Sequence, residues 1–308
     1  MYFPYFRGRQ YELLALKELA TNDLLGKSVI PVVEPVKFSP TFNGTLNVYN
    51  DTQYPVALLL NPTVGDLVNN PSAIDSLLSV VKNNTNCIPT VLFNQKAESV
   101  IDTIRLSEIP QEDILTILNN RDFINTYRKF FASGSPRYTL IPDERQIKRT
   151  VTQNKVLFED KFNKQDRNAD YPEEEFFSED HLFYTEEGYA GFGDYSIIGD
   201  EYIESGFAPY AVAIHIVYFA DDDTLRICHF ISDSNEDISD VAGKFYEAVS
   251  KLSEWFRNGQ QRQQTVALNT LVEYADSGYY PGLPTIKKLS IMHHLELLGK
   301  FLDGGLRR

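Results

Sequence analysis

The feature that most constrains the fold of this chain is a series of short, almost purely apolar runs. Strands that are apolar at nearly every position are buried on both faces, which is typical of parallel sheets covered by helices. We predict eight such strands, at residues 29–35, 54–62, 88–95, 137–144, 155–160, 194–200, 211–219 and 225–231. The first six end in a carboxylate or an amide side chain.

Segments with helical periodicity alternate with these strands, at residues 11–19, 73–81, 97–106, 110–131, 240–257, 264–275 and 287–302. Alternation of this kind predicts parallel strand–helix–strand units. About eight strands in a chain of 308 residues favour an α/β fold, and specifically an irregular (β/α)8, TIM-like barrel.

The last two predicted strands are separated only by residues 220–224. A connection of this length suits a β-hairpin, whereas a parallel crossover needs roughly a dozen residues or more. We therefore expect the barrel to be irregular near strands seven and eight, with a hairpin there. An open, mixed sheet is the alternative.

We expect residues 1–308 to form a single barrel-like domain, because no internal repeat and no low-complexity linker divides the chain. Residues 161–193 are rich in acidic and aromatic side chains and predict a long polar loop. Long loops in compact domains often serve as lids or binding loops. A solvated acidic loop is the alternative interpretation.

The formal net charge of −14 disfavours non-specific binding to nucleic acids, since an acidic protein repels phosphate backbones. No apolar stretch approaches the roughly 20 residues of a membrane-spanning helix, and the N-terminal residues lack the hydrophobic region of a signal peptide. The two cysteines, Cys87 and Cys228, lie in apolar runs and predict buried, free thiols. We therefore expect a cytoplasmic protein with no membrane partner.

Polar residues at the ends of the predicted strands are the first candidates for a functional site, because active sites of barrels form beyond the carboxyl ends of the strands. Carboxylate oxygens suit Mg²⁺ or Mn²⁺, so we predict that Glu34, Asp143 and Asp200 hold a metal ion of this kind. Glu159 and Asp160, which end another strand, are predicted to be catalytic. The alternative is that these acids only cap helices and complement their dipoles.

Histidine and arginine residues complete the candidate set. His215 lies inside a predicted strand and is a candidate base, since a histidine near acidic strand ends can exchange protons. A hydrogen-bonded core histidine is the alternative. Arg7, Arg9 and Arg167 are candidate anion-binding residues, because the guanidinium group forms paired hydrogen bonds with phosphate or carboxylate. They could equally form a surface patch.

Several segments resemble one protein family. Residues 2–19 together with 30–35 are similar to the start of Beta-family proteins, which are named after a satellite-phage protein. A bacterial branch of that family has the closer similarity, at residues 161–171, 191–195, 213–215 and 287–297, so the resemblance runs over nearly the whole chain. The resemblance implies a gene of mobile elements and defence islands whose product acts with neighbouring gene products against phage. It implies no catalytic residues.

Three functional hypotheses follow. The leading one is a component of a phage-defence or mobile-element module that acts through a protein partner encoded nearby. The second is a metal-dependent phosphodiester hydrolase, in which the strand-end carboxylates hold Mg²⁺ or Mn²⁺ and Arg7 or Arg9 binds phosphate. The third is a small-molecule sensor whose segment 161–193 closes over a ligand.

Overall fold

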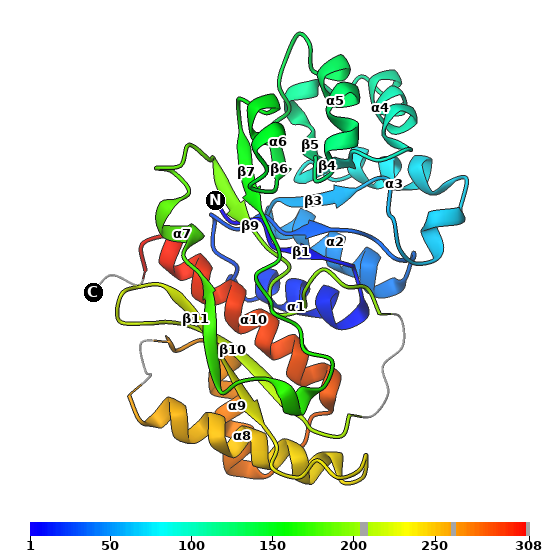
Figure 1. Ribbon diagram of the computed structural model, residues 1–308. Helices are drawn as coiled ribbons and strands as arrows, with labels where there is room; N and C mark the ends of the chain where they lie inside the picture. The colour runs from blue at the N-terminus through cyan, green and yellow to red at the C-terminus, as the bar shows by residue number, and fades with distance from the viewer. Residues whose placement is uncertain (204–208, 260–262, 306–308) are drawn as a thin grey trace.

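The computed structural model describes residues 1–203, 209–259 and 263–305. Its larger sheet contains eight parallel strands in the order β1-β2-β3-β4-β5-β6-β7-β9. The strands are β1 (Tyr5–Phe6), β2 (Val32–Val33), β3 (Val56–Leu59), β4 (Cys87–Leu92), β5 (Leu115–Ile117), β6 (Tyr138–Ile141), β7 (Lys155–Phe158) and β9 (Gly191–Gly193). With helices between the strands, this is the predicted TIM-like barrel, seen in the upper part of Figure 1.

The barrel closes where the N-terminal segment meets β9. Tyr2 forms a parallel bridge with Phe192, and the amide of Phe3 donates a hydrogen bond of 2.8 Å to the Phe192 carbonyl. A Cβ atom at Gly191 would lie only 2.7 Å from the Met1 carbonyl oxygen, so closure at this point requires glycine. Gly191 and Gly193 lie within the predicted loop at 161–193, but in the structure they belong to the eighth barrel strand.

Alternation along the strands separates the barrel interior from its outer shell. Ala57 and Leu59 of β3 belong to the interior cluster, whereas Val56 and Leu58 belong to the cluster beneath the helices. Side chains of one strand alternate between the two faces of a sheet, and both faces are covered here. This arrangement explains why the strands read as continuous apolar runs. The interior is filled by Phe3, Tyr5, Ile30, Val32, Ala57, Leu59, Ile88, Leu115, Ile117, Leu140, Val156 and Phe158.

Helices on the outside of the barrel connect its strands. They are α1 (Gln10–Thr21), α2 (Pro40–Thr52), α3 (Ala73–Lys82), α4 (Ala97–Leu106), α5 (Ile124–Phe130) and α6 (Arg145–Thr150), with short 3-10 turns at Asp66–Asn69, Gln111–Asp113 and Arg121–Phe123. The helix α4 shows the common pattern, since Ala97, Val100, Ile101 and Ile104 form one buried stripe.

A second, antiparallel sheet lies beside the barrel, with the strand order β10-β11-β8. Its strands are β8 (Glu174–Ser178), β10 (Ala213–Phe219) and β11 (Leu225–Ile231), and the helices α8 (Val241–Arg257) and α9 (Val266–Ser277) follow it. The expected hairpin at 220–224 is present and joins β10 to β11. These two predicted strands therefore lie outside the barrel.

The helix α10 (Leu283–Leu302) lies between the barrel and the second sheet, where Figure 1 shows it in red. It packs on α1 from one side and on β10 and α9 from the other. Every residue from Leu289 to Gly299 is buried, because neighbours cover this helix on all sides. Two of its buried polar residues are paired on the neighbouring elements: His293 contacts the Thr265 hydroxyl and the Val217 carbonyl, and Glu296 accepts from the Val266 amide.

Three expectations about elements are wrong. Residues 194–200 do not form a strand, because the Asp194 carboxylate accepts a 2.7 Å hydrogen bond from the Ser196 amide and the chain turns there. The predicted helix at 110–131 contains β5 and only a short helix, since Leu115–Ile117 is β-branched in part and pairs with both neighbouring strands. The predicted loop at 161–193 contains β8, β9, a 3-10 turn at Asn168–Asp170 and the short helix α7 (Asp180–Phe183).

The structure also bears on the two cysteines and on membrane-spanning helices. Cys87 and Cys228 are both buried and free, as predicted. Within the described ranges, none of the helices has both the length and the apolar character needed to cross a bilayer.

Candidate functional site

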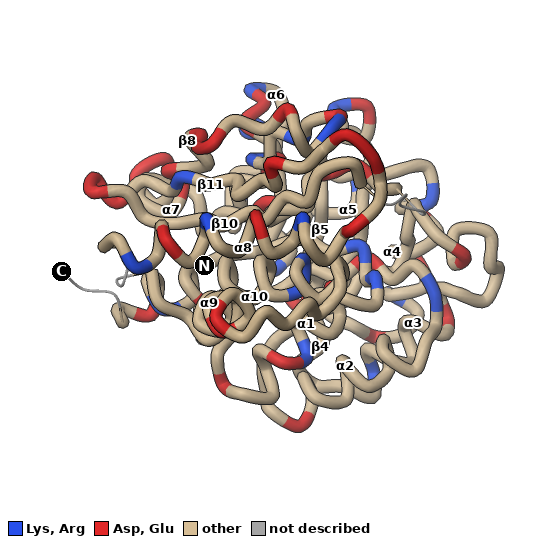
Figure 2. The backbone as a smooth tube through the Cα atoms, turned by 90° about the horizontal axis from the view of Figure 1, so that it is seen from below, with Lys and Arg blue, Asp and Glu red and all other residues tan. Residues whose placement is uncertain are grey.

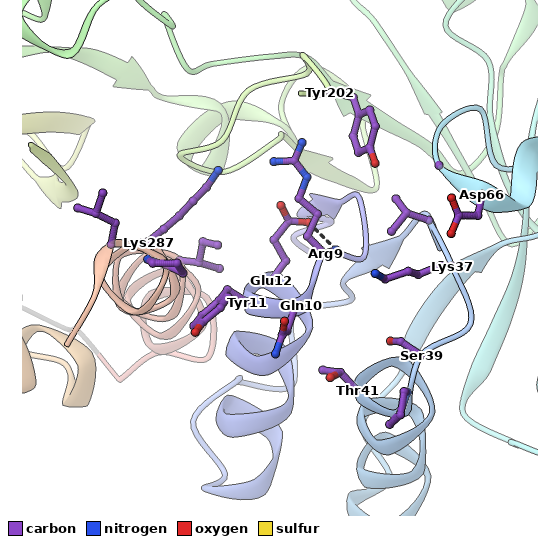
Figure 3. A pocket seen from close by; sticks show the side chains of 16 residues that line it. Arg9, Gln10, Tyr11, Glu12, Lys37, Ser39, Thr41, Asp66, Tyr202 and Lys287 are labelled. Carbon is purple, nitrogen blue, oxygen red and sulfur yellow. Dashed lines mark hydrogen bonds between the residues drawn. The ribbon is translucent and has the colours of Figure 1, made fainter. Parts of the chain in front are cut away.

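The main candidate site is a cavity of about 730 Å³ at the carboxyl ends of β1, β2 and β3. Figure 3 shows it from close by. Its volume lies within the range of roughly 300–1,000 Å³ that is usual for small-molecule sites. The lining residues are Arg9, Gln10, Tyr11, Glu12, Val36, Lys37, Ser39, Pro40, Thr41, Gly65, Asp66, Tyr202, Leu283, Pro284, Lys287 and Ile291.

Three helices begin at this cavity. The first residues of α1, α2 and α10 line it, and only α1 has an acidic residue in its first turn. The free amides at a helix N-terminus carry a partial positive charge, which favours an anion. Ser39 caps α2 by accepting a 3.1 Å hydrogen bond from the Phe42 amide, and Pro40 and Pro284 pre-set the first turns of α2 and α10.

Basic side chains surround the same space. Arg9, Lys37 and Lys287 line the cavity, and none of them forms an ion pair with another residue of the described ranges. Arg9 donates to the Ile203 carbonyl, and its guanidinium group lies 4.8 Å from the centre of the Tyr202 ring. Burial lowers the pKa of Lys287, and the nearby Glu12 carboxylate opposes this effect. An anion beside Lys287 would restore the charge that burial disfavours.

Two acidic residues, Glu12 and Asp66, line the cavity together with these basic side chains, and Glu12 is the buried one. Its side chain is only 2% exposed, and its Oε2 accepts a 3.3 Å hydrogen bond from the Arg9 amide. Its Oε1 is buried and has no hydrogen-bond partner among the described residues. An unpaired buried carboxylate oxygen costs free energy, so this atom is suited to accept a hydrogen bond from a ligand hydroxyl or amine.

The mouth of the barrel itself is filled by a self-contained polar cluster. Glu34 is buried, and its carboxylate accepts hydrogen bonds from the Tyr5 hydroxyl at 2.7 Å and from the amide and hydroxyl of Thr63 at 2.6 and 2.8 Å. The Nε of Arg7 lies 3.4 Å from the same carboxylate, and the Arg7 guanidinium group packs over the rings of Tyr5 and Tyr195. Arg7 and Glu34 therefore neutralise each other's charge, although the Arg7 Nε has no hydrogen-bond partner among the described residues.

The predicted metal ligands are not brought together. Glu34 is paired with Arg7, Asp143 lies on the rim beside Lys148, and Asp200 is exposed with its amide bonded to Asp160. Over the ranges that the structure describes, no group of three or more His, Cys, Asp or Glu side chains is arranged to hold a metal ion. Glu34 and Asp143 each pair with a basic side chain instead. The shared site for Mg²⁺ or Mn²⁺ at Glu34, Asp143 and Asp200 therefore gains no support from the geometry and stays a prediction.

The three predicted catalytic residues, Glu159, Asp160 and His215, also bond to different partners. Glu159 bonds to Lys161 at 2.9 Å, and Asp160 accepts from the amides of Phe162 and Asp200 at 3.0 and 2.8 Å. Burial raises the pKa of Asp160. His215 lies on β10, in the second sheet, and is bonded to another histidine rather than to either acid.

His215 lines a second, smaller cavity of about 220 Å³, which adjoins the first because Leu283 and Lys287 line both. Several residues of the segment 161–193 form part of its wall, namely Phe162, Lys164, Asn168 and Tyr171. Arg167 is exposed and lines neither cavity. Of the three predicted anion-binding residues, only Arg9 lies at the larger cavity.

The sequence patterns singled out none of Glu12, Lys37, Tyr202 and Lys287, which all line the larger cavity. The helix α2 was not predicted, although its buried residues Phe42, Thr45, Leu46 and Tyr49 follow a helical spacing. Recognising that helix, with Ser39 and Pro40 at its start, would have marked this position as a helix N-terminus beside Lys37.

Comparison with known proteins adds no relative to this picture: no protein-family model, curated protein or solved structure matches the chain. Acidic and basic residues are interspersed over the described elements in the view of Figure 2. In this acidic protein, the cavity at the starts of α1, α2 and α10 is lined by three basic residues, Arg9, Lys37 and Lys287, and two acidic ones, Glu12 and Asp66.

Proposed function

We propose that this protein binds a small phosphorylated molecule in the cavity at the starts of α1, α2 and α10. The observation that carries the proposal is the convergence of three helix N-termini with Arg9, Lys37 and Lys287, none of which is ion-paired within the described residues. Helix N-termini and basic side chains together form a typical phosphate site. The acidic surface elsewhere favours a small ligand over a long polyanion.

The geometry favours this proposal over a metal-dependent phosphodiester hydrolase. The hydrolase hypothesis needs carboxylates that share one metal ion. Three of the strand-end acids, Asp143, Glu159 and Glu34, are instead paired with Lys148, Lys161 and Arg7. A binding function needs only the cavity, the positive charge and a hydrogen-bond acceptor such as Glu12. We therefore retain the hypothesis of a small-molecule sensor. Its ligand would bind between α10 and the loops that follow β1, β2 and β3.

The resemblance to Beta-family proteins supplies a setting for such a sensor. In a cytoplasmic phage-defence or mobile-element module, a barrel that binds a phosphorylated metabolite would report its concentration to a partner protein encoded nearby. The helix α10 is suited to such coupling, since it lines the cavity and also packs on the second sheet. This role and the identity of the partner belong to the proposal.

Isothermal titration calorimetry with ribose 5-phosphate tests the binding function. We expect the variant Lys287→Ala to lose affinity about ten- to hundredfold, because a hydrogen bond to a charged group contributes about 1.5–3 kcal/mol. Lys288→Ala is the matched control. That lysine is the next residue of the same helix, and its amine is paired with Glu18 rather than directed to the cavity.

Two results would contradict the proposal. One is that ribose 5-phosphate and inorganic phosphate produce no heat of binding with the wild-type protein at millimolar concentration. The other is that Lys287→Ala and Lys288→Ala weaken binding equally, which would indicate a general effect of net charge.

A further inference from the structure

A chain of three side chains crosses the second sheet and ends at the smaller cavity. His215 and His229 face each other across β10 and β11, with their Nδ1 atoms 2.7 Å apart. The Nε2 of His229 lies 3.2 Å from the Glu175 carboxylate on β8. The His229 side chain is fully buried between these two partners.

The bonding partners determine which nitrogen carries each proton. Burial lowers the pKa of both histidines, to about 3 for His215, so both rings are neutral at physiological pH. The Glu175 carboxylate can only accept, so the Nε2 of His229 carries the proton and its Nδ1 is an acceptor. The Nδ1 of His215 must then donate to it. The Nε2 of His215 is left as an acceptor for the cavity that this ring lines.

The smaller cavity has the size and the walls for a flat ring. Its volume of about 220 Å³ exceeds the ~150 Å³ that is known to hold a benzene molecule in a protein core. Phe162, Tyr171, Ile197, Val212 and Ile286 form apolar and aromatic walls around it. The polar residues Lys164, Asn168, Lys287 and Ser290 also line the cavity. His215 therefore presents one acceptor between apolar walls, and a few polar groups placed in this way fix the orientation of a bound ring.

We infer that the phosphorylated ligand is a nucleotide, whose base occupies the smaller cavity and donates an N–H hydrogen bond to the Nε2 of His215. This inference rests on the proposed function, because the phosphate would occupy the larger cavity beside Arg9 and Lys37. Lys287 lines both cavities and lies where the two parts of the ligand meet. The buried Oε1 of Glu12 is a suitable acceptor for a ribose hydroxyl.

The test compares nucleotides with the sugar phosphate alone. Titration calorimetry with AMP, GMP, CMP, UMP and ribose 5-phosphate is carried out on the wild-type protein and two variants. Ala213→Met fills the smaller cavity, since Ala213 lines it. His215→Phe keeps a ring of similar shape but removes the acceptor. The affinity for ribose 5-phosphate reports whether each variant is folded and retains the larger cavity.

We expect at least one nucleotide to bind the wild-type protein about tenfold or more tightly than ribose 5-phosphate, since the base adds a hydrogen bond and buries apolar surface. Both variants should lose this advantage and keep the affinity for ribose 5-phosphate. If none of the four nucleotides binds more tightly than ribose 5-phosphate, or if the gain survives in both variants, the inference is overturned and the proposed function still stands. If no probe binds, the proposed function fails as well.

Discussion

Asp194 offers the sharpest test of the physical chemistry of this structure. It follows β9 at the closure of the barrel, and its side chain is only 3% exposed. Burial raises the pKa of this carboxyl from 3.8 to about 7, against the effect of hydrogen bonds from the Tyr2 hydroxyl and the Ser196 amide, each 2.7 Å long. The folded protein therefore holds a proton there over a pH range in which the unfolded chain has released it.

The sign of the pH dependence follows from this difference. Between pH 3.8 and about 7 the folded state binds more protons at Asp194 than the unfolded state, so the free energy of unfolding falls as the pH rises. From pH 5 to pH 8, these two pKa values correspond to a loss of about 3 kcal/mol. The variant Asp194→Asn removes the titration. It can keep both hydrogen bonds, because both end on the Oδ1 atom.

The measurement is urea unfolding of the wild-type protein and Asp194→Asn at several pH values between about 5 and 8. The difference between the two proteins is the decisive quantity, because buried histidines act in the opposite direction. Burial lowers the pKa of His293 to about 4 and that of His294 to about 3, so their contribution to stability is lost as the pH falls below 6.5. This effect is common to both proteins and cancels.

We expect Asp194→Asn to gain about 3 kcal/mol of stability over the wild-type protein between pH 5 and pH 8. Tyr2→Phe should act in the other direction. Removing the hydroxyl that stabilises the carboxylate raises the pKa of Asp194 further and moves the pH-dependent loss to higher pH. Parallel pH profiles for the wild-type protein and Asp194→Asn would refute the reasoning.

Three further predictions concern the fold. In urea unfolding, Gly193→Ala should lower the free energy of unfolding by about 1–3 kcal/mol, because a Cβ at this position would collide with the backbone of Phe3. The control variant Gly44→Ala in α2 should instead raise the free energy of unfolding by about 0.5–1 kcal/mol, and equal effects of the two variants would contradict the reasoning. Thr265→Ala should cost about 1–2 kcal/mol, since Thr265 caps α9 by accepting from the Leu268 amide, and Thr265→Ser should retain most of that stability. Glu34→Ala should lower the melting temperature by several degrees, because it leaves Arg7 without its buried partner, and an unchanged melting temperature would show that the polar cluster contributes nothing.

The elements that could be predicted are those whose signal is local. The strand β3 could be predicted because its residues, Val56–Leu59, are all apolar, and all of them are buried in the structure. The recurrence of such apolar runs predicts the (β/α)8 architecture. The hairpin between β10 and β11 follows from the short connection at 220–224. These inferences need no knowledge of which residues meet in space.

The sequence patterns could not predict which sheet each strand belongs to. Apolar runs at 211–219 and 225–231 look like barrel strands, yet they pair with β8 in a separate sheet. The last barrel strand is instead the short, glycine-containing β9, which has only one apolar side chain, Phe192. Its role depends on contact with the N-terminal segment, which is distant in sequence.

The candidate site shows the same division. The sequence by itself determined the barrel class, its polar strand ends and the basic character of Arg9, because composition and periodicity are properties of short segments. Only the tertiary structure decided that Arg9, Lys37 and Lys287 share one cavity, that Glu34 is neutralised by Arg7, and that His215 pairs with His229. Each of these facts depends on chain closure and packing, which bring together residues that no local pattern connects.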